Sequence, residues 1–256
     1  MIFPDFGQFH TTVKKFPLYN ECYKEIDMGI IETLNQWDTE LFLYLNSFHN
    51  SFWDYTMTLF TRTEIWLLFY LVIFITIIRK YKRKSLLVFL VITLLIILAD
   101  QGSGILKHSI ERLRPSHDPY VAPLAHNFFK KGGLYGFVSA HAANSFGFAI
   151  FSVLLFRNRI FTVFMITWSL LIASTRIYLG VHYPGDILGG IILGSLIGWG
   201  MYRLLLFLEA FMRPRKPEFI IPMENKRVYN IILAAFVVIG FSMLVVNFFL
   251  KHHMFA

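Results

Sequence analysis

Three short polar clusters interrupt an otherwise apolar chain of 256 residues, and together they hold the side chains that phosphoryl transfer requires. Two histidines, several cations and one carboxylate can hold a phosphate group and attack it. A charged side chain near the middle of a membrane costs about 2.5–3.5 kcal/mol, so we expect such groups at an interface or in a cavity. The clusters are Lys107 with Arg114-Pro115, then Ser139-Ala140-His141, then Thr175-Arg176 with His182 and Asp186.

The third cluster has the spacing of a nucleophile and the group that orients it. Pro184 and Gly185 predict a tight turn into the following helix, with proline in the first helical positions. Asp186 can then accept a hydrogen bond from one ring nitrogen of His182, which fixes the tautomer and makes the imidazole a better nucleophile. A structural His–Asp hydrogen bond is the alternative interpretation.

The other two clusters can bind an anion. Lys107 and Arg114 are seven residues apart, or two helical turns, so the spacing predicts that they share a helix face. Pro115 disfavours helix at Arg114 and predicts that the helix ends there. Ser139 is a predicted N-cap, which leaves free N–H groups in the first turn, where His141 lies. Taken singly, these clusters also fit a snorkelling basic helix end and a capping serine beside an incidental histidine.

The composition predicts a membrane protein, with 56% hydrophobic residues and a mean hydropathy of +0.56. A full span needs roughly 20 residues. The last two of six apolar runs reach that length, and the other four must include flanking residues to span. The run that starts at residue 86 can continue to Leu106, and the run that starts at residue 160 can continue to Tyr178. We therefore predict an all-α integral membrane bundle of about six transmembrane helices. The runs cover residues 65–78, 86–99, 142–156, 160–173, 187–208 and 228–250.

The lysines and arginines in the loops predict the orientation. They gather at residues 79–84, 157–159 and 213–227, which fall on one face if each run crosses the membrane once. That face is predicted to be cytoplasmic, so the three clusters face the periplasm or the cell exterior from an inner or plasma membrane. Topology and phosphate binding explain the net charge of +8, and no compact basic run with interleaved aromatic residues indicates nucleic-acid binding.

Residues 25–60 mix apolar and acidic positions in a spacing that predicts an amphipathic helix at the outer interface. We expect an extracytoplasmic or interfacial segment at 1–62, a helical core at 63–210, and a basic cytoplasmic loop with an additional transmembrane helix at 211–256. Gly190, Gly194 and Gly198 form a stripe of small residues that favours close helix packing. The lone Cys22 excludes a multi-cysteine metal site.

In its three clusters the chain resembles the type 2 phosphatidic acid phosphatase superfamily of membrane lipid phosphatases, which is recognised by K-x6-RP, PSGH and SR-x5-H-x3-D. Lys107 and Arg114-Pro115 match the first motif in full. Residues 138–141 match the second motif with Val for Pro and Ala for Gly, and the third motif is matched with Thr175 in place of Ser. The resemblance covers about residues 65–208.

The resemblance implies a phosphohistidine mechanism without a metal or another cofactor. His182 attacks phosphorus, Asp186 orients it, His141 protonates the leaving group, and water then cleaves the phosphoenzyme. The residues that hold the phosphoryl oxygens are Lys107, Arg114, Arg176, Ser139 and Ala140.

The expected substrate is a lipid phosphate or a polyprenyl diphosphate in the outer leaflet, such as undecaprenyl diphosphate, phosphatidylglycerol phosphate, phosphatidate or a lipid A phosphate. Residues 116–136 are too polar to span and join two of the clusters, so we expect them to form a rim over the site. Lys130 and Lys131 on this rim suit a second phosphate, or else anionic lipid head groups.

Other functions remain open from the sequence. A lipid phosphotransferase differs only in the acceptor, while a non-catalytic lipid binder or transporter has no need of His182 and Asp186. A vanadate haloperoxidase shares the fold of this family, but the membrane spans argue against it. A metal site is a further alternative. However, its candidate ligands are irregularly spaced, and no two of them have the spacing of a ligand pair on a helix face or in a short loop. Those ligands are His108, His117, His126 and Asp118.

Overall fold

The computed structural model describes residues 29–128, 130–212, 219, 221 and 223–251. In these ranges the regular elements are helices, and Leu113 and Tyr135 form an isolated bridge. Two helices, α3 (Ile30–Asn46) and α4 (Ser51–Phe60), precede the first apolar run. The long helices are α5 (Leu67–Tyr81), α6 (Ser85–Ile110), α7 (Ala140–Phe156), α8 (Arg159–Tyr178), α9 (Pro184–Phe211) and α10 (Asn225–Lys251), and short 3-10 turns occupy Thr63–Trp66 and Lys82–Lys84.

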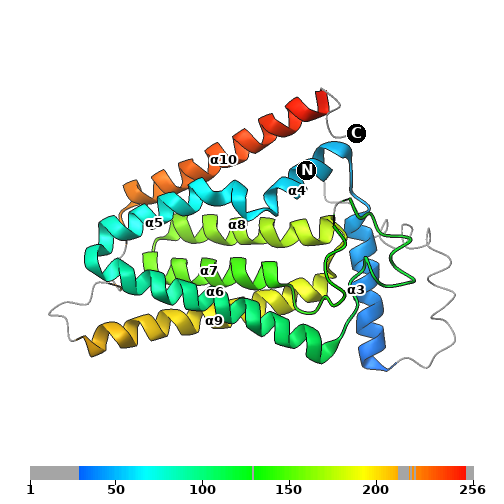
Figure 1. Ribbon diagram of the computed structural model, residues 1–256, viewed down its shortest axis with the longest axis horizontal. Helices are drawn as coiled ribbons and strands as arrows, with labels where there is room; N and C mark the ends of the chain where they lie inside the picture. The colour runs from blue at the N-terminus through cyan, green and yellow to red at the C-terminus, as the bar shows by residue number, and fades with distance from the viewer. Residues whose placement is uncertain (1–28, 129, 213–218, 220, 222, 252–256) are drawn as a thin grey trace.

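The six predicted apolar runs all form helices. Four helical stretches are long and apolar enough to cross a membrane, namely Thr63–Ile110, Arg159–Tyr178, Pro184–Phe211 and Asn225–Phe248. The first is 48 residues long and contains both α5 and α6, which turn back on each other at Lys82, where φ is 49° (Figure 1). The remaining run forms α7, a shorter apolar helix of 17 residues. The prediction of an all-α membrane bundle is therefore confirmed.

Helix α7 is the centre of the bundle, with α6, α8 and α9 packed around it (Figure 1). The glycine stripe of α9 makes the closest of these contacts possible. A Cβ at Gly194 would clash with the carbonyl oxygen of Ala143, which leaves no room for a side chain. This is the packing role that the sequence predicted. Because α7 and α9 begin at the second and third clusters, their contact also brings these clusters together.

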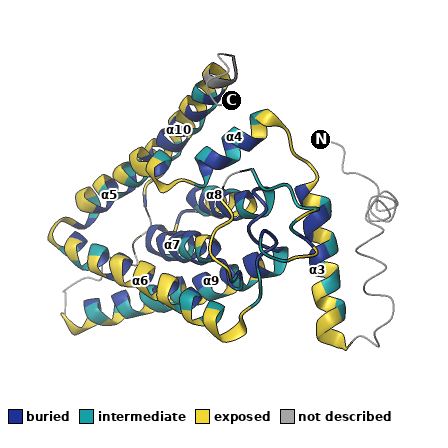
Figure 2. Ribbon diagram, turned by 45° about the vertical axis from the view of Figure 1, so that its right-hand side comes forward, coloured by how far each residue is buried: buried dark blue, intermediate teal, exposed yellow. Residues whose placement is uncertain are grey.

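The interior and the outer surface of the bundle are both apolar. The largest core cluster joins α5, α6, α7 and α8 and contains the rings of Trp66, Phe69 and Trp168, with centroids 5.3–5.9 Å apart. Exposed residues line the outward sides of α5, α6 and α10 (Figure 2). Many of them are large apolar side chains, as lipid contact requires. They include Leu71, Leu90 and Phe236.

The predicted amphipathic segment contains two helices rather than one, and its residues 25–28 lie outside the described ranges. Helix α3 ends at Asn46, and α4 starts after Asn50, whose side chain accepts a hydrogen bond from the Trp53 N–H at 3.0 Å. Helix α3 runs across the end of the bundle (Figure 1). Its buried residues face the bundle, and its exposed side carries the apolar residues that suit a membrane interface. These are Ile30, Ile31, Leu34, Trp37, Leu41 and Leu45.

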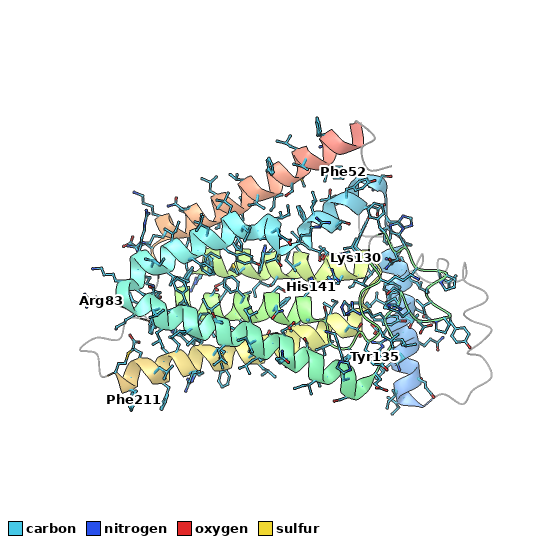
Figure 3. All side chains as sticks on the ribbon, in the orientation of Figure 1. Phe52, Arg83, Lys130, Tyr135, His141 and Phe211 are labelled. Carbon is cyan, nitrogen blue, oxygen red and sulfur yellow. The ribbon has the colours of Figure 1, made fainter. Side chains whose placement is uncertain are left out.

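The two ends of the bundle differ in their polar residues. Arg83 and Phe211 lie at one end, and Lys130 and Tyr135 lie at the other (Figure 3). His141 lies in the first turn of α7, and α7 begins on the side of the second of these ends (Figure 1). The candidate chemistry is therefore opposite the basic turn between α5 and α6.

Candidate active site

His182 and Asp186 form a buried hydrogen-bonded pair. His182 lies just before α9, and Pro184 begins the helix as predicted. The His182 Nδ1 atom is 3.1 Å from Asp186 Oδ2, and the Tyr183 N–H donates to the same oxygen at 3.1 Å. Both side chains are almost fully buried. The bond to Nδ1 leaves Nε2 as the ring nitrogen that can attack.

The first cluster reaches the site in a different way from the one predicted. Helix α6 ends at Ile110, and Glu111 adopts a left-handed conformation with φ 53°, so Lys107 and Arg114 do not share a helix face. Arg114 instead lies in the loop, where its backbone N–H donates to the Leu134 carbonyl at 3.1 Å. The prediction that Lys107 and Arg114 share a helix face is therefore wrong, because α6 ends at Ile110, before the chain reaches Pro115.

Loop contacts hold the guanidinium of Arg114 in place. Its Nε donates to the Tyr135 carbonyl at 3.0 Å, and its Nη1 donates to the Val181 carbonyl at 3.5 Å, next to His182. Gly132 lies directly against the guanidinium, since a Cβ there would be 2.7 Å from Nη1. Gly132 also has a φ of +75°, which glycine adopts without strain. The loop therefore positions Arg114 beside the third cluster.

The second cluster begins α7 as the sequence predicted. Ser139 is the N-cap, and its side chain accepts from the Ala142 N–H at 3.5 Å. The Ser139 N–H donates to the Asp186 carbonyl at 2.9 Å, which joins the start of α7 to the start of α9. Ala140 is the first helical residue and is half-buried. His141 follows in the first turn and lies within electrostatic range of the other candidate residues, which are Arg176, His182, Arg114 and Lys107.

Arg176 lies in the last turn of α8, and a residue that is not part of the third motif fixes its side chain. Its Nη1 donates to the Thr61 hydroxyl, which follows α4, at 2.6 Å. Its Nε is buried and has no hydrogen-bond partner among the described residues. A buried donor of this kind is costly unless it is paired, so an anion at this position stabilises it. Thr175 is buried and uses its hydroxyl within α8, where it donates to the Ile172 carbonyl at 2.7 Å.

The surroundings of His182 favour a neutral ring. Burial lowers the pKa of His182 well below its ordinary value of 6.5, because the charged form loses solvation. The charges of Arg114, Arg176 and Lys107 lower this pKa further, while a backbone hydrogen bond with Gly136 raises it. A neutral imidazole among three fixed cations can act as a nucleophile toward a bound phosphate.

Arg112 and Asp38 also reach this site, although the sequence pattern did not indicate them. Arg112 Nη1 lies 3.2 Å from Asp186 Oδ1 and 2.7 Å from Asp38 Oδ2, and its guanidinium stacks on the Tyr183 ring at 4.2 Å. Asp38 comes from α3 and accepts a hydrogen bond from the Gly185 N–H at 2.7 Å. Burial raises the pKa of Asp38 above its ordinary value, and Arg112 opposes this shift. The sequence signal for this group is the alternating charge of Asp38, Arg112 and Asp186. It is hard to detect, because the three residues are far apart in the sequence.

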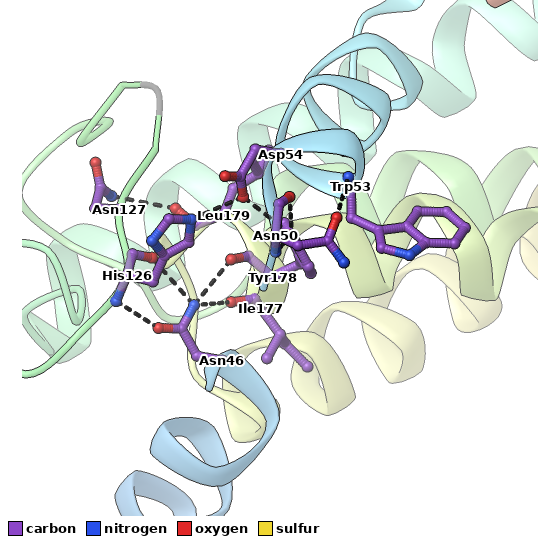
Figure 4. A network of polar contacts seen from close by, with 9 residues as sticks. All are labelled: Asn46, Asn50, Trp53, Asp54, His126, Asn127, Ile177, Tyr178 and Leu179. Carbon is purple, nitrogen blue, oxygen red and sulfur yellow. Dashed lines mark hydrogen bonds and ion pairs between the residues drawn. The ribbon is translucent and has the colours of Figure 1, made fainter. Parts of the chain in front are cut away.

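A polar network fixes α3 and α4 to the end of α8 (Figure 4). The buried Asn46 side chain donates to the carbonyls of His126, Ile177 and Tyr178 and accepts from the His126 N–H at 2.7 Å. Asp54 accepts from the Tyr178 hydroxyl at 3.0 Å and pairs with His126 Nε2 at 2.8 Å. These contacts hold α3, α4 and the loop in one position relative to the site.

The predicted rim is a loop that covers the same end of the bundle. Lys130 and Lys131 are exposed, and the Lys131 carbonyl accepts from the buried Ser116 hydroxyl at 2.8 Å. Gly136 packs closely on the site, because a Cβ there would lie 2.6 Å from Asp186 Oδ2.

Each residue of the alternative metal site makes other contacts. His126 pairs with Asp54, and the ring of His117 lies 3.2 Å from the Gly132 carbonyl. Asp118 accepts from the Tyr120 and Val121 N–H groups in its own turn, at 2.9 and 3.1 Å. His108 packs against Tyr135 at the end of α6.

Comparisons with known proteins identify relatives of this chain. The model of the PAP2 superfamily matches residues 84–210. A lipid A 4'-phosphatase of Bacteroides thetaiotaomicron is 40% identical over 192 residues, which cover 73% of this chain and 85% of the relative. A lipid A 4'-phosphatase of Porphyromonas gingivalis is 28% identical, over 81% of this chain and 91% of the relative.

A solved structure has the same fold. The transmembrane PAP2-type phosphatidylglycerolphosphate phosphatase of Bacillus subtilis matches with a TM-score of 0.54 at 19% identity, and the match covers 80% of this chain and 98% of that chain. The family match includes all three clusters, and the fold match agrees with the helical membrane bundle of this chain. This chain is therefore an integral membrane protein that belongs to the PAP2 superfamily.

Proposed function

We propose that this protein is a membrane lipid phosphatase that acts through a phosphohistidine on His182. The observation that carries the proposal is the buried pair of His182 and Asp186, with Nδ1 and Oδ2 3.1 Å apart. The ring is kept neutral by burial and by nearby cations, and Arg176 holds a buried N–H without a partner among the residues described. This arrangement supports nucleophilic attack on a phosphate that the cations hold.

The reaction has two steps in this proposal. His182 Nε2 attacks phosphorus, the bond from phosphorus to the lipid oxygen breaks, and His141 gives that oxygen a proton. Water then gives a proton to His141 as it attacks the phosphohistidine, the bond from phosphorus to Nε2 breaks, and inorganic phosphate and a free imidazole are released. Asp186 accepts the hydrogen bond from Nδ1 and stabilises the positive charge that develops on the ring. Lys107, Arg114 and Arg176 stabilise the phosphoryl oxygens in both steps, together with the first-turn N–H groups after Ser139-Ala140.

A lipid A phosphate is the substrate that we favour. Two lipid A 4'-phosphatases match most of this chain, at 40% and 28% identity, and their coverage includes much of the chain outside the family model. In this proposal the substrate is a phosphate monoester on an acylated sugar, which the three cations suffice to hold. A polyprenyl diphosphate is the alternative substrate, for which the exposed Lys130 and Lys131 offer extra positive charge at the rim.

The proposed site faces the outer leaflet. Arg83 and Phe211 lie at the end of the bundle opposite Lys130 (Figure 3), and each adjoins a basic segment of the sequence. Basic loops remain on the cytoplasmic side of a membrane. The site then opens toward the periplasm or the cell exterior.

The experiment for this function is phosphate release by the purified protein in detergent. Lipid A, undecaprenyl diphosphate, phosphatidylglycerol phosphate and phosphatidate are compared at equal surface concentration. We expect the highest kcat/KM with lipid A and loss of turnover in the His182→Ala variant. No release from any of these lipids contradicts the proposal. A lipid phosphotransferase is recognised in the same assay if loss of the substrate requires an added lipid alcohol and the alcohol, rather than water, takes up the phosphate.

A further inference from the structure

An open groove of about 420 Å³ lies between α5 and α10, which pack along each other (Figure 1). Its walls follow one face of each helix, because the lining residues are spaced by three and four. The Thr76 hydroxyl is used within α5, where it donates to the Val72 carbonyl at 2.7 Å, so the walls are suited to hydrocarbon. The wall residues are Val72, Ile75 and Thr76 on α5 and Leu233, Ala234 and Val237 on α10.

The groove faces outward, toward the lipid that surrounds the bundle. Ile75, Leu233 and Val237 are 38–63% exposed in the isolated chain. Both helices lie outside residues 84–210, which match the family model. The groove is therefore a feature that this chain adds to the core of the family.

Cations line the end of this groove at the turn between α5 and α6. Arg79 is part of the groove itself. A second hollow, of about 410 Å³, is lined by Lys80, Lys82 and Arg227. Arg79 and Lys80 are consecutive in the sequence, so the two hollows are neighbours. Lys80 Nζ is held at this end by the Ile221 carbonyl, to which it donates at 2.6 Å.

The positive charge at this end exceeds the negative charge. Glu224 is the one carboxylate among the described residues that line the two hollows. It lies 3.8 Å from Arg227 Nε, and both side chains are exposed, so the pair is weak. Arg79 and Lys82 have no ion-pair partner in the described part of the chain. This end of the groove therefore suits an anion.

The side chains along α10 follow the order of the parts of a glycerophospholipid. Arg227, Asn230, Ala234 and Val237 succeed one another at intervals of about one turn. A phosphate suits Arg227, an ester carbonyl suits the exposed amide of Asn230, and an acyl chain suits the wall beyond it. The distance from Asn230 to Val237 is about 10 Å, about two-thirds of the hydrocarbon depth of one leaflet.

We propose that this groove binds an anionic phospholipid from the leaflet at the end of the bundle opposite the proposed active site. The phosphate lies between Arg79 and Arg227, and one acyl chain lies between α5 and α10. A zwitterionic lipid is bound less well, because these cations repel its ammonium group. The bound lipid contacts both helices and stabilises α10 against α5. This site is separate from the proposed phosphatase site and does not depend on it.

The test is the binding of lipids to the purified protein in detergent, measured by native mass spectrometry. Phosphatidylglycerol and phosphatidylcholine with identical chains are titrated separately. The wild type is compared with the double variant Arg79→Gln/Arg227→Gln and with Val237→Trp, which fills the groove. We expect the wild type to bind phosphatidylglycerol about tenfold more tightly than phosphatidylcholine. This preference should fall to about twofold or less in the double variant, and Val237→Trp should weaken the binding of phosphatidylglycerol severalfold.

Matched controls change the same residue types outside the groove. Arg83→Gln/Arg203→Gln removes two exposed arginines, and Leu196→Trp enlarges an exposed residue on α9. Arg176→Gln removes a cation of the proposed active site. All three variants should keep the wild-type preference for phosphatidylglycerol.

Several outcomes overturn the inference. Equal affinity of the wild type for the two lipids does so even if a variant fails to fold. A preference that Arg79→Gln/Arg227→Gln keeps, or that the controls lose to the same extent, also does so. Glycerol phosphate that binds as tightly as phosphatidylglycerol assigns the cations to a soluble anion. A dimer that Val237→Trp dissociates places a second copy of the chain in the groove instead of a lipid.

Discussion

Arg112 donates to the Asp186 oxygen that does not face His182. The Arg112 Nη1 atom is 3.2 Å from Asp186 Oδ1, while His182 Nδ1 is 3.1 Å from Oδ2. The same Nη1 atom lies 2.7 Å from Asp38 Oδ2, so a carboxylate on α3 fixes the arginine from behind. The carboxylate that orients the nucleophile is thus held on both of its oxygens. This places Arg112 and Asp38 as positioning residues that act through Asp186.

The first prediction concerns these positioning residues. Arg112→Gln should lower kcat by about tenfold or more and change KM less, because a charged hydrogen bond to Asp186 is lost. Asp38→Asn should have a smaller effect in the same direction. Arg112→Lys should retain part of the activity, since the charge remains while the planar contact with Tyr183 is lost. Steady-state kinetics with one lipid substrate separates kcat from KM.

The control for Arg112 is Arg203→Gln, which removes an exposed arginine from α9. It should leave both constants at their wild-type values. If Arg112→Gln behaves like this control, or changes only KM, the positioning role is contradicted.

A second prediction follows from the close approach of Gly136 to the site. A methyl group at Gly136 would lie 2.6 Å from Asp186 Oδ2, so Gly136→Ala must displace the loop or the carboxylate. We expect a loss of at least tenfold in kcat/KM. Gly133→Ala is the matched control in the same loop, because a Cβ there meets nothing within 4 Å. Equal activity of the two variants would show that the loop does not constrain Asp186.

The sequence predicted the local features of this site well and its tertiary contacts poorly. Apolar runs and caps depend on neighbouring residues, so the helix starts at Ser139 and Pro184 and the His182–Asp186 bond were all expected. The end of α6 at Ile110 was missed, because the left-handed residue that follows the helix is Glu111, and no glycine marks this position in the sequence.

The contacts of Arg112 show why the rest of the site could not be predicted. Arg112 is 74 residues from Asp186 in the sequence, and its other partner, Asp38, lies on a helix outside the family match. Thr61, which holds Arg176, is 115 residues away from it. The packing of α3 and α4 against the bundle brings Asp38 and Thr61 to the site.

A third prediction concerns the protonation of His182. Its pKa is lowered by burial and then by Arg114, Arg176 and Lys107, so the ring stays neutral at pH values below the ordinary histidine pKa of 6.5. The nucleophile should therefore remain active at about pH 6, where an exposed histidine is mostly protonated. Ring nitrogen chemical shifts of labelled protein report the titration directly. Arg114→Gln removes one cation and should raise the pKa of His182, and titration at or above 6.5 in the wild type contradicts this explanation.

A fourth prediction concerns the need for a metal. Lys107, Arg114 and Arg176 supply fixed positive charge in the proposed mechanism, so phosphate release should continue in an excess of EDTA. Vanadate should inhibit, because it mimics the five-coordinate transition state that the site binds best. Loss of activity in EDTA that Zn²⁺ or Mg²⁺ restores contradicts a metal-independent mechanism.

The nucleophilic role of His182 is tested most directly by trapping the phosphoenzyme. The protein is mixed with a lipid substrate labelled in its phosphate, quenched in alkali within the first turnover, and digested for mass spectrometry. We expect an acid-labile, base-stable phosphate on His182 in the wild type, and neither labelled protein nor phosphate release in His182→Ala. A phosphate on another residue, or phosphate release by His182→Ala at a rate near that of the wild type, contradicts the mechanism.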